Sequence, residues 1–447
     1  MRVLPQVHPL GRQPPLLCAL RKLGEEPGLC LLESADGQND QWSWLFFEPL
    51  PLDAQPESIA DLRGLLERLE LAAVSVPGPF RAGFVGALSY DLGVAGERRV
   101  WCEQDPWHWP KIVGGLRTDF LVRESRTGET WLVLGQADSA PTEFAAQRAA
   151  RIRARLAQPA PALETPQATG ELERHTTPAQ HRERVQRMRQ EIAAGDYYQA
   201  NLAHSFTRAV RGHPVRWYER LCERNPAPFM GYLDFGRGAL LSASPELLLE
   251  SRGARLMTRP IKGTRPRARD SEQDRALAHE LLASEKDRAE LAMIVDLARN
   301  DLGRVSRTAS VRVEGGFPRL ESYASVHHLL ADVVGELKPE LDSLHALAAL
   351  FPGASITGAP KLASMAAIAR AEGEGRSFFT GSLGWIDRSG DSSWNILIRT
   401  LLYRSLGAGH GEFRFSVGGG ITHASDPQAE EEETLVKAAR LLETLSP

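Results

Sequence analysis

Glu246 and Lys262 are the two residues in this sequence whose types and spacing best suit catalysis. Glu246 follows Ser-Pro and precedes an apolar run, and Lys262 stands inside Pro260-Ile-Lys-Gly-Thr264. The intervening Ser251-Arg-Gly253 is typical of a turn between two strands. A hairpin that closes there would bring the carboxyl and the amine to the same side, where they could support nucleophilic and acid–base chemistry. A surface ion pair is the simpler alternative.

Acidic residues near the C-terminus form a second candidate site. Glu430 and Glu433 share one face of a predicted helix, 426–445, with Lys437. Acids in the first turns complement the helix dipole, which explains part of this pattern. However, consecutive glutamates at 430–433 repel one another unless a cation binds. Together with Glu290, which stands among apolar positions of an earlier helix, Glu430 and Glu433 would offer the oxygen ligands that suit Mg²⁺.

The sequence predicts both helices and strands to position these candidate residues. Thr177 and Pro178 begin a helix that Gly195 ends. Apolar periodicity predicts further helices over 59–71, 144–156, 270–284, 285–299 and 426–445. Strand-like runs lie at 29–34, 42–47, 83–91, 131–134, 196–202, 323–334, 380–386, 394–403 and 413–417. The hairpin that carries Glu246 and Lys262 belongs to this strand-rich part of the chain.

The length and one stretch of unusual composition predict the domain organisation. The chain has 447 residues, which is enough for two conventional domains. Residues 157–172 are rich in Pro, Ala and Thr and lack periodicity, as linkers do. We therefore expect an N-terminal lobe at 1–156, a linker at 157–172 and a catalytic domain at 173–447.

The charge and the cysteines argue against several classes of protein. A formal net charge of −4 argues against a general nucleic-acid-binding protein. The 4 cysteines are scattered without metal-type spacing, as expected of free thiols in a reducing compartment. The N-terminus lacks the apolar core of a signal peptide, and no apolar stretch is long enough to span a bilayer. We therefore expect a cytoplasmic protein that binds neither nucleic acid nor membrane.

The motifs resemble those of the chorismate-utilising enzymes, the family of anthranilate synthase component I, aminodeoxychorismate synthase component I, and the isochorismate and salicylate synthases. The resemblance covers essentially all of residues 173–447, and Leu31-Leu-Glu-Ser34 and Tyr90-Asp91 look like the N-terminal lobe of the two amidating branches. It implies an α+β fold, a large antiparallel β-sandwich with helices outside and the site between the sheets. The matching motifs are Ser244-Pro-Glu246, Pro260-Ile-Lys-Gly-Thr264, Arg288-Ala-Glu290, Val295–Asp301, Ser355–Lys361, Ile398-Arg-Thr400, Gly418–Gly420 and Ser425–Thr434.

The resemblance implies a metal site and a general acid. Glu290 and Glu433 would bind Mg²⁺, with Glu430 as a further carboxylate at the site. The metal would hold the ring carboxylate of chorismate. Glu246 would be the general acid that helps the 4-hydroxyl group of chorismate to leave.

The resemblance also places the substrate. Arg399 would bind the carboxylate of the enolpyruvyl arm together with the backbone amides of 418–420, since a guanidinium and N–H groups both suit a carboxylate. His328 matches the site histidine of the family, although a histidine on a strand is more often a satisfied core residue. The implied substrate-binding positions are Gly263, Thr264, Trp385, Arg399, Gly418, Gly419, Gly420 and Lys437.

Two positions distinguish the branches of the family. Gln199 stands where isochorismate and salicylate synthases have a lysine that activates water. Lys262 stands where anthranilate synthases have alanine, as in the aminodeoxychorismate synthase branch, which Asn225–Phe229 also resembles. The implied reaction has two steps: Lys262 attacks C2 as the 4-hydroxyl leaves, and ammonia then attacks C4 and expels Lys262. The product is 4-amino-4-deoxychorismate, a precursor of 4-aminobenzoate and folate.

The nitrogen source and the regulation follow from the same resemblance. The sequence lacks a glutaminase nucleophile motif, so ammonia would come from a glutamine amidotransferase partner or from solution. Anthranilate synthase component I with an atypical lysine, and a silent paralogue that acts as a binding subunit, stay open as alternatives. In the anthranilate branch two segments form an inhibitory tryptophan pocket, and here we expect at most a vestigial one. Its positions would be Leu32, Glu33, Ser34, Pro228, Phe229 and Met230.

Overall fold

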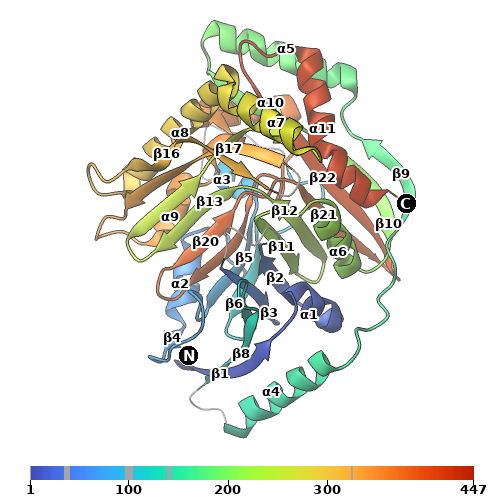
Figure 1. The fold of residues 1–447 in the computed structure, drawn as a ribbon, viewed down its shortest axis with the longest axis vertical. Coiled ribbons are helices and arrows are strands. Elements are labelled where there is room, and N and C mark those ends of the chain that lie inside the picture. Colours follow the sequence, from blue (N-terminus) through green and yellow to red (C-terminus); the bar gives the residue numbers. More distant parts are fainter. Residues whose placement is uncertain (1, 35–40, 96–103, 138–141, 324–325, 447) are drawn as a thin grey trace.

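The computed structural model describes residues 2–34, 41–95, 104–137, 142–323 and 326–446. Within these ranges the strands form one sheet of 13 strands and one of 9 (Figure 1). The larger sheet contains β1 (Arg2–Arg12), β2 (Cys30–Glu33), β3 (Trp42–Phe46), β4 (Glu70–Leu71), β7 (Phe120–Glu124), β8 (Glu129–Ala137), β9 (Gln167–Arg174), β10 (Gln199–Arg211), β11 (Phe229–Asp234), β12 (Gly238–Ser244), β18 (Gly358–Ala359), β21 (Thr400–Gly407) and β22 (His410–Ile421).

The smaller sheet carries the predicted catalytic hairpin. It contains β5 (Gly83–Leu88), β6 (Ile112–Arg117), β13 (Leu247–Arg252), β14 (Arg255–Arg259), β15 (Ile261–Pro266), β16 (Arg312–Ser322), β17 (Val326–Glu336), β19 (Ser382–Asp387) and β20 (Ser392–Asn395). Neighbouring strands in this sheet are antiparallel. In the larger sheet β1 and β4 form a parallel pair, whereas the pairs around β10, β22 and β21 are antiparallel.

Helices cover the outer faces of the sheets. They are α1 (Leu16–Leu23), α2 (Asp61–Glu67), α3 (Tyr90–Ala95), α4 (Thr142–Ala157), α5 (Pro178–Ala194), α6 (Pro214–Arg224), α7 (Ser271–Ala283), α8 (Glu285–Val305), α9 (Ser343–Leu350), α10 (Lys361–Glu372) and α11 (Pro427–Leu445), with a 3₁₀ turn at Ala354–Ile356. Apolar residues of α8 and α9 pack on the smaller sheet, and those of α1, α6 and α11 pack on the larger one.

The inner faces of the two sheets meet in an aromatic core. Trp44 and Phe46 of the larger sheet lie close to Trp385 of the smaller sheet, with Phe80 between them. The ring centroids of Phe80 and Trp385 are 5.5 Å apart and the rings meet edge to face, which is a favoured geometry for aromatic pairs. The predicted α+β fold, with antiparallel sheets inside and helices outside, is confirmed.

The predicted ends of several helices are confirmed, because the local sequence signals for them are strong. The Thr177 hydroxyl accepts a hydrogen bond from the Gln180 N–H in a capping box at the start of α5. Gly195 ends that helix with a φ of 89°, a left-handed conformation that glycine adopts without strain. Asp426 caps α11, the helix that carries the predicted metal ligands.

Other predictions about the elements are wrong. The helix predicted to end near 299 runs through Gly303 to Val305, because Leu302 and Val305 are buried and extend its apolar face. The strand predicted over 394–403 is divided into β20 and β21, and Arg399 between them has a φ of 52°. The strand predicted over 83–91 ends at Leu88, where the helix α3 soon follows.

The predicted domain division remains a prediction. Both sheets contain strands from 1–156 and from 173–447. The chain leaves α4 and runs over the surface to β9, which begins at Gln167, inside the predicted linker (Figure 1).

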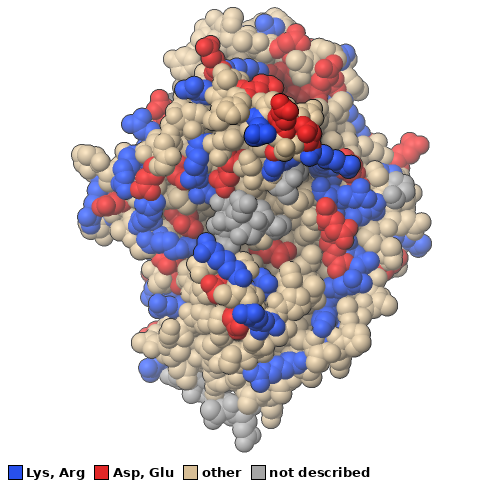
Figure 2. All heavy atoms as spheres, viewed as in Figure 1, with Lys and Arg blue, Asp and Glu red and all other residues tan. Residues whose placement is uncertain are grey.

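Basic and acidic side chains are interspersed over the face shown in Figure 2, and the formal net charge is −4. Within the described ranges, no helix combines the length and the apolar character needed to cross a membrane.

Candidate active site

The carboxyl of Glu246 and the amine of Lys262 lie at one place, as the predicted hairpin requires. β13 and β14 form the hairpin, with Arg252 opposite Arg255 at its closed end. At the open end, the backbone N–H of Ile261 donates a hydrogen bond to the Glu246 carboxylate, and the Lys262 charge acts on the same group. The hairpin therefore delivers an acid and an amine to one site.

Glu246 has the properties of a group that carries a proton at neutral pH. Its residue is only 5% exposed, and this burial raises the pKa of the carboxyl to about 7. The nearby Ser355 hydroxyl, the Lys262 charge and the Ile261 N–H oppose this rise because each favours the ionised form. A carboxyl with a pKa near neutrality suits general acid catalysis.

Lys262 lies in surroundings that favour its neutral form. Burial, followed by the positive charge of Lys437, lowers the pKa of the Lys262 amine below its usual range. Glu290, Glu246 and Glu433 oppose this shift. A larger neutral fraction makes the amine available as a nucleophile.

Two glycines of β22 leave the space in which these side chains meet. A Cβ atom on Gly420 would lie 3.4 Å from Lys262 Nζ and 2.6 Å from Gln199 Nε2. A Cβ atom on Gly419 would lie 3.1 Å from Glu430 Oε2. Because Gly420 belongs to the larger sheet and Lys262 to the smaller one, the site lies between the two sheets, as expected.

The three predicted metal ligands come from two helices and interact electrostatically. Glu290 is on α8, and Glu430 and Glu433 are on α11. Burial raises the pKa of Glu430, and the charge of Glu433 adds to this effect. Lys437 lowers the pKa of Glu433 and forms an ion pair with it at 2.8 Å. Lys286 Nζ lies 3.9 Å from Glu290 Oε1.

The donor chemistry of this set fits a hard divalent cation, because all three side chains offer carboxylate oxygens. In the part of the chain that the structure describes, no group of three or more acidic, histidine or cysteine side chains converges closely enough to hold an ion. Lysines neutralise these carboxylates instead: Lys437 beside Glu433 and Lys286 beside Glu290. The assignment of Mg²⁺ to these residues therefore stays a proposal.

His328 and Thr264 face each other across β17 and β15. His328 Nδ1 lies 2.9 Å from Thr264 Oγ1 and 3.3 Å from the carbonyl oxygen of Gly263. Burial, followed by the charge of Arg399, lowers the pKa of His328 to about 3, so the ring is neutral at physiological pH. Its Nε2 atom is buried and has no hydrogen-bond partner among the described residues. An unpaired buried nitrogen beside the site is available to a ligand.

In the described ranges, no acidic side chain forms an ion pair with the Arg399 guanidinium. Burial lowers the pKa of its guanidinium. Its φ of 52° is uncommon for a residue other than glycine, and such backbone strain occurs often at functional sites. A partly buried, unpaired guanidinium is suited to a carboxylate of a ligand.

The structure places one predicted substrate-binding residue in the aromatic core. Trp385 is 2% exposed, and its ring packs against Trp44 and Phe80 under the Arg252 guanidinium, 4.9 Å from the ring centroid. The aromatic core and the cation occupy its surroundings, so the indole has no free face for a substrate. The alternation along β19 places this residue toward the core between the sheets.

The segments of the predicted tryptophan pocket lie side by side. β2 pairs with β11, so Glu33 is opposite Met230 and Leu32 is opposite Gly231. Burial raises the pKa of Glu33 to about 7. The Asn395 side chain donates to the carbonyl oxygen of Phe229, the residue that follows Pro228. Ser34 directly follows β2. The role of this pocket is untested and stays a prediction.

Two residues near the acid and the amine had no assigned catalytic or binding role. Gln199 reaches the space beside Lys262, and its Oε1 atom is buried without a partner in the described structure. Ser355 lies next to Glu246. The sequence could have indicated Ser355, because this residue begins the motif 355–361. Its position beside Glu246, however, is known only from the tertiary structure.

Comparison with known proteins agrees with this architecture. A family model described as "chorismate binding enzyme" matches residues 32–443. Aminodeoxychorismate synthase component 1 of Bacillus subtilis is 36% identical over 80% of this chain and 76% of its own length. Anthranilate synthase component 1 of Haloarcula marismortui is 35% identical over 97% of this chain and 92% of its own.

A solved structure resembles the whole chain. The crystal structure of anthranilate synthase component I from Streptococcus pneumoniae matches with a TM-score of 0.75 and 27% identity, over 97% of this chain and 91% of that one. Relatives named for two different activities are thus about equally similar in sequence to this chain.

Proposed function

The chain belongs to the chorismate binding enzyme family, as an enzyme of the anthranilate and aminodeoxychorismate synthase type, and from this premise we propose that it makes 4-amino-4-deoxychorismate from chorismate and ammonia. The observation that carries the proposal is the amine of Lys262. It lies beside Glu246 and points into the space next to Gly420. An amine at this position supplies a nucleophile that alanine could not.

In the first proposed step, Lys262 and Glu246 act together. The neutral Lys262 amine uses its lone pair to attack C2 of chorismate, the ring double bond shifts, and the 4-hydroxyl leaves with a proton from Glu246 as water. The depressed pKa of Lys262 and the raised pKa of Glu246 both support the protonation states that this step needs.

In the second step ammonia attacks C4, the double bond shifts back, and the bond between C2 and Lys262 breaks. Lys262 leaves as a neutral amine, and the product nitrogen keeps the positive charge. Throughout, Arg399 and the N–H groups of 418–420 would hold the enolpyruvyl carboxylate. Thr264 and His328, whose Nε2 has no partner in the described structure, would orient the ring. Mg²⁺ held by Glu290 and Glu433, with Glu430 beside them, would neutralise the ring carboxylate.

Product identification tests this function against anthranilate synthesis. The purified chain is incubated with chorismate, Mg²⁺ and ammonium, and the product is separated by chromatography and identified by mass and fluorescence. We expect 4-amino-4-deoxychorismate. Fluorescent anthranilate as the main product would overturn the proposal in favour of the related activity, and failure to consume chorismate would favour a silent paralogue.

The pH dependence should show two limbs. Glu246, whose pKa is raised to about 7, must be protonated, so kcat/KM for chorismate at a fixed concentration of free ammonia should fall on the alkaline side, where both groups have lost their protons. Lys262 must be neutral, so the rate should also fall on the acid side, where that amine becomes protonated. In Glu246→Gln the alkaline limb should disappear along with most of the activity. An unchanged alkaline limb in this variant would show that another group is the acid.

Ammonium should support the reaction alone, whereas glutamine should require an added amidotransferase. The reason is that the chain lacks a sequence typical of a glutaminase nucleophile. Product formation is measured with each nitrogen source, before and after addition of a glutaminase subunit. Product from glutamine with the rigorously purified single chain would contradict the prediction.

Tryptophan should have little effect on turnover. A pathway to 4-aminobenzoate gives no reason for tryptophan feedback, even though Glu33 and Met230 lie together as the pocket requires. Initial rates are measured across a tryptophan titration, with thermal unfolding as a parallel readout of binding. Strong inhibition would contradict the prediction and favour anthranilate synthesis, whereas stabilisation without inhibition fits a vestigial site.

A further inference from the structure

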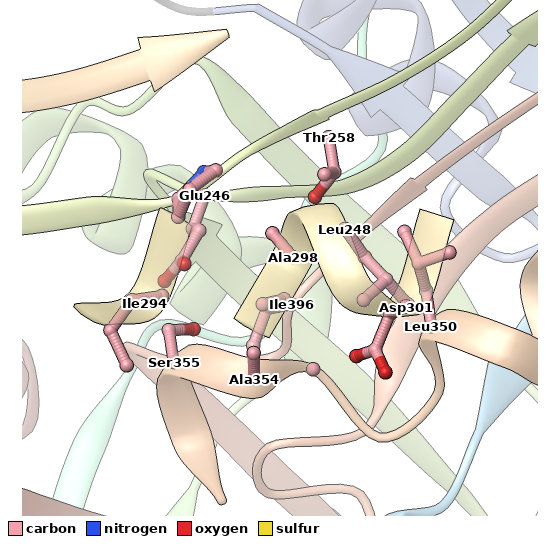
Figure 3. A pocket seen from close by; sticks show the side chains of 12 residues that line it. Glu246, Leu248, Thr258, Ile294, Ala298, Asp301, Leu350, Ala354, Ser355 and Ile396 are labelled. Carbon is pink, nitrogen blue, oxygen red and sulfur yellow. The ribbon is translucent and has the colours of Figure 1, made fainter. Parts of the chain in front are cut away.

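A cavity is lined by Glu246 together with residues outside the proposed substrate site (Figure 3). Its polar lining residues are Glu246, Thr258, Asp301 and Ser355. Lys262, His328, Arg399 and the glycines at 418–420 do not line it. In Figure 3, Glu246 and Ser355 lie at one end of the lining and Asp301 lies at the other. The cavity therefore meets the proposed reaction machinery at the acid.

The proposed reaction leaves Glu246 without its proton. Chorismate, ammonia and the Glu246 proton become a product ammonium, water and an ionised Glu246, while Lys262 ends each turnover as the neutral amine with which it began. The product ammonium has no reason to return a proton, since amines are more basic than this carboxyl. Each turnover therefore requires one proton from solvent at Glu246.

We propose that the cavity between Glu246 and Asp301 holds water and is the route by which that proton returns. This inference rests on the proposed function, because it takes Glu246 as the acid of the reaction. A water beside Glu246 passes a proton to the carboxylate oxygen and takes one from the next water, and the last donor is bulk water. Only O–H bonds form and break, and no electrons are transferred.

The near end of the cavity is polar. Ser355 is buried, and its hydroxyl interacts with the Glu246 carboxyl and favours the ionised form. Buried waters in proteins lie beside polar groups such as these. The side chain of Thr258 lines the same cavity and adds a second hydroxyl.

At the far end of the cavity, Asp301 forms ion pairs with two basic side chains. Asp301 accepts from Lys361 at 2.7 Å and from Arg304 at 3.2 Å. Lys361 also donates to the carbonyl oxygens of Leu350 and Pro352, which hold the chain ahead of Ser355. The side chain of Arg304 is 57% exposed, so the ion-paired cluster at this end of the cavity reaches the protein surface. The cluster also links two sequence motifs, at 295–301 and 355–361, to the acid.

Ala298 allows a matched test because it lines the cavity from α8 and has no role in the proposed substrate site. Ala298→Leu fills the space and excludes water, whereas Ala298→Ser keeps the volume open and adds a hydroxyl. Rapid quenching gives the rate of the first turnover, which uses the proton already on Glu246. Steady-state kcat gives the full cycle, including the return of the proton.

For Ala298→Leu we expect a first turnover near the native rate, a kcat lower by about tenfold or more, and a larger solvent deuterium isotope effect on kcat. Ala298→Ser should behave like the native chain. If Ala298→Leu does not fold, Thr258→Val replaces it as the test, because it removes one hydroxyl at nearly constant volume. Thr258→Val should also lower kcat relative to the rate of the first turnover. Unchanged kcat and an unchanged isotope effect in a folded Ala298→Leu or Thr258→Val variant would overturn the proposal.

Product analysis in the same quenched samples separates the two ideas. If the native chain makes anthranilate, the proposed function fails. The ratio of first turnover to kcat still reports on the cavity, because replacement of the hydroxyl by ammonia uses an acid in either case.

Discussion

Replacing Lys262 with alanine is expected to reduce 4-amino-4-deoxychorismate formation by several orders of magnitude. The covalent route divides one difficult displacement into two easier ones, and alanine removes the nucleophile on which both depend. Arg399, Glu246 and the carboxylates on α8 and α11 are untouched, so chorismate should still bind. Any residual product made with ammonium should shift toward the 2-amino isomer, since ammonia could then occupy the place of the lost amine.

Lys262→Arg separates a nucleophile from a mere positive charge. A guanidinium stays protonated and cannot attack C2, so the arginine variant should be as inactive as the alanine variant. If the lysine only neutralised substrate charge, arginine would restore much of the activity. Near-native formation of the 4-amino product by Lys262→Arg would therefore exclude the nucleophile role, provided that thermal unfolding shows both variants to be folded.

Glu433→Gln and Glu290→Gln should each lower turnover by more than about a hundredfold, because loss of even an outer-shell partner costs metal sites 10–100-fold in affinity or activity. Each change removes one carboxylate charge from the proposed Mg²⁺ site while it keeps the size of the side chain. The measurement is turnover as a function of Mg²⁺ concentration, which should saturate at higher Mg²⁺ in any variant that stays active.

Glu432→Gln is a matched control on the same helix. Glu432 is exposed and accepts from Gln428, and we assign it no role in the site. Its substitution should leave the Mg²⁺ dependence unchanged. Full activity of the native chain and of both site variants in a chelator would refute the metal assignment.

The sequence predicted that Glu246 and Lys262 lie together because a short hairpin constrains its own ends. The turn at Gly253 and the strands on either side are local features, and they bring Glu246 and Lys262 together whatever lies beyond them. The caps of α5 and α11 are local as well. For these elements the sequence signals and the tertiary structure agree.

The remaining features depend on contacts between distant segments. Trp385 reads as a plausible ligand-binding aromatic, yet packing against Trp44 and Phe80 decides its place in the core. At the site the end of β22 lies beside Lys262 of β15, and Gly420 leaves room for the Gln199 amide, which a Cβ atom would meet at 2.6 Å. Similarly, the cavity behind Glu246 exists because Ser355, Asp301 and Thr258 come from three separate elements, and their juxtaposition has no local signal.

The covalent role of Lys262 is tested most directly by mass spectrometry of the native chain with chorismate and Mg²⁺ but no ammonia. Without ammonia the second step cannot occur, so the adduct should accumulate. We expect the intact protein to gain the mass of chorismate less one water, and we expect the added mass to lie on the peptide that contains Lys262. Lys262→Arg should show no such gain. Absence of the adduct from a native chain that forms the 4-amino product when ammonia is added, or an adduct on a different peptide, would contradict the account.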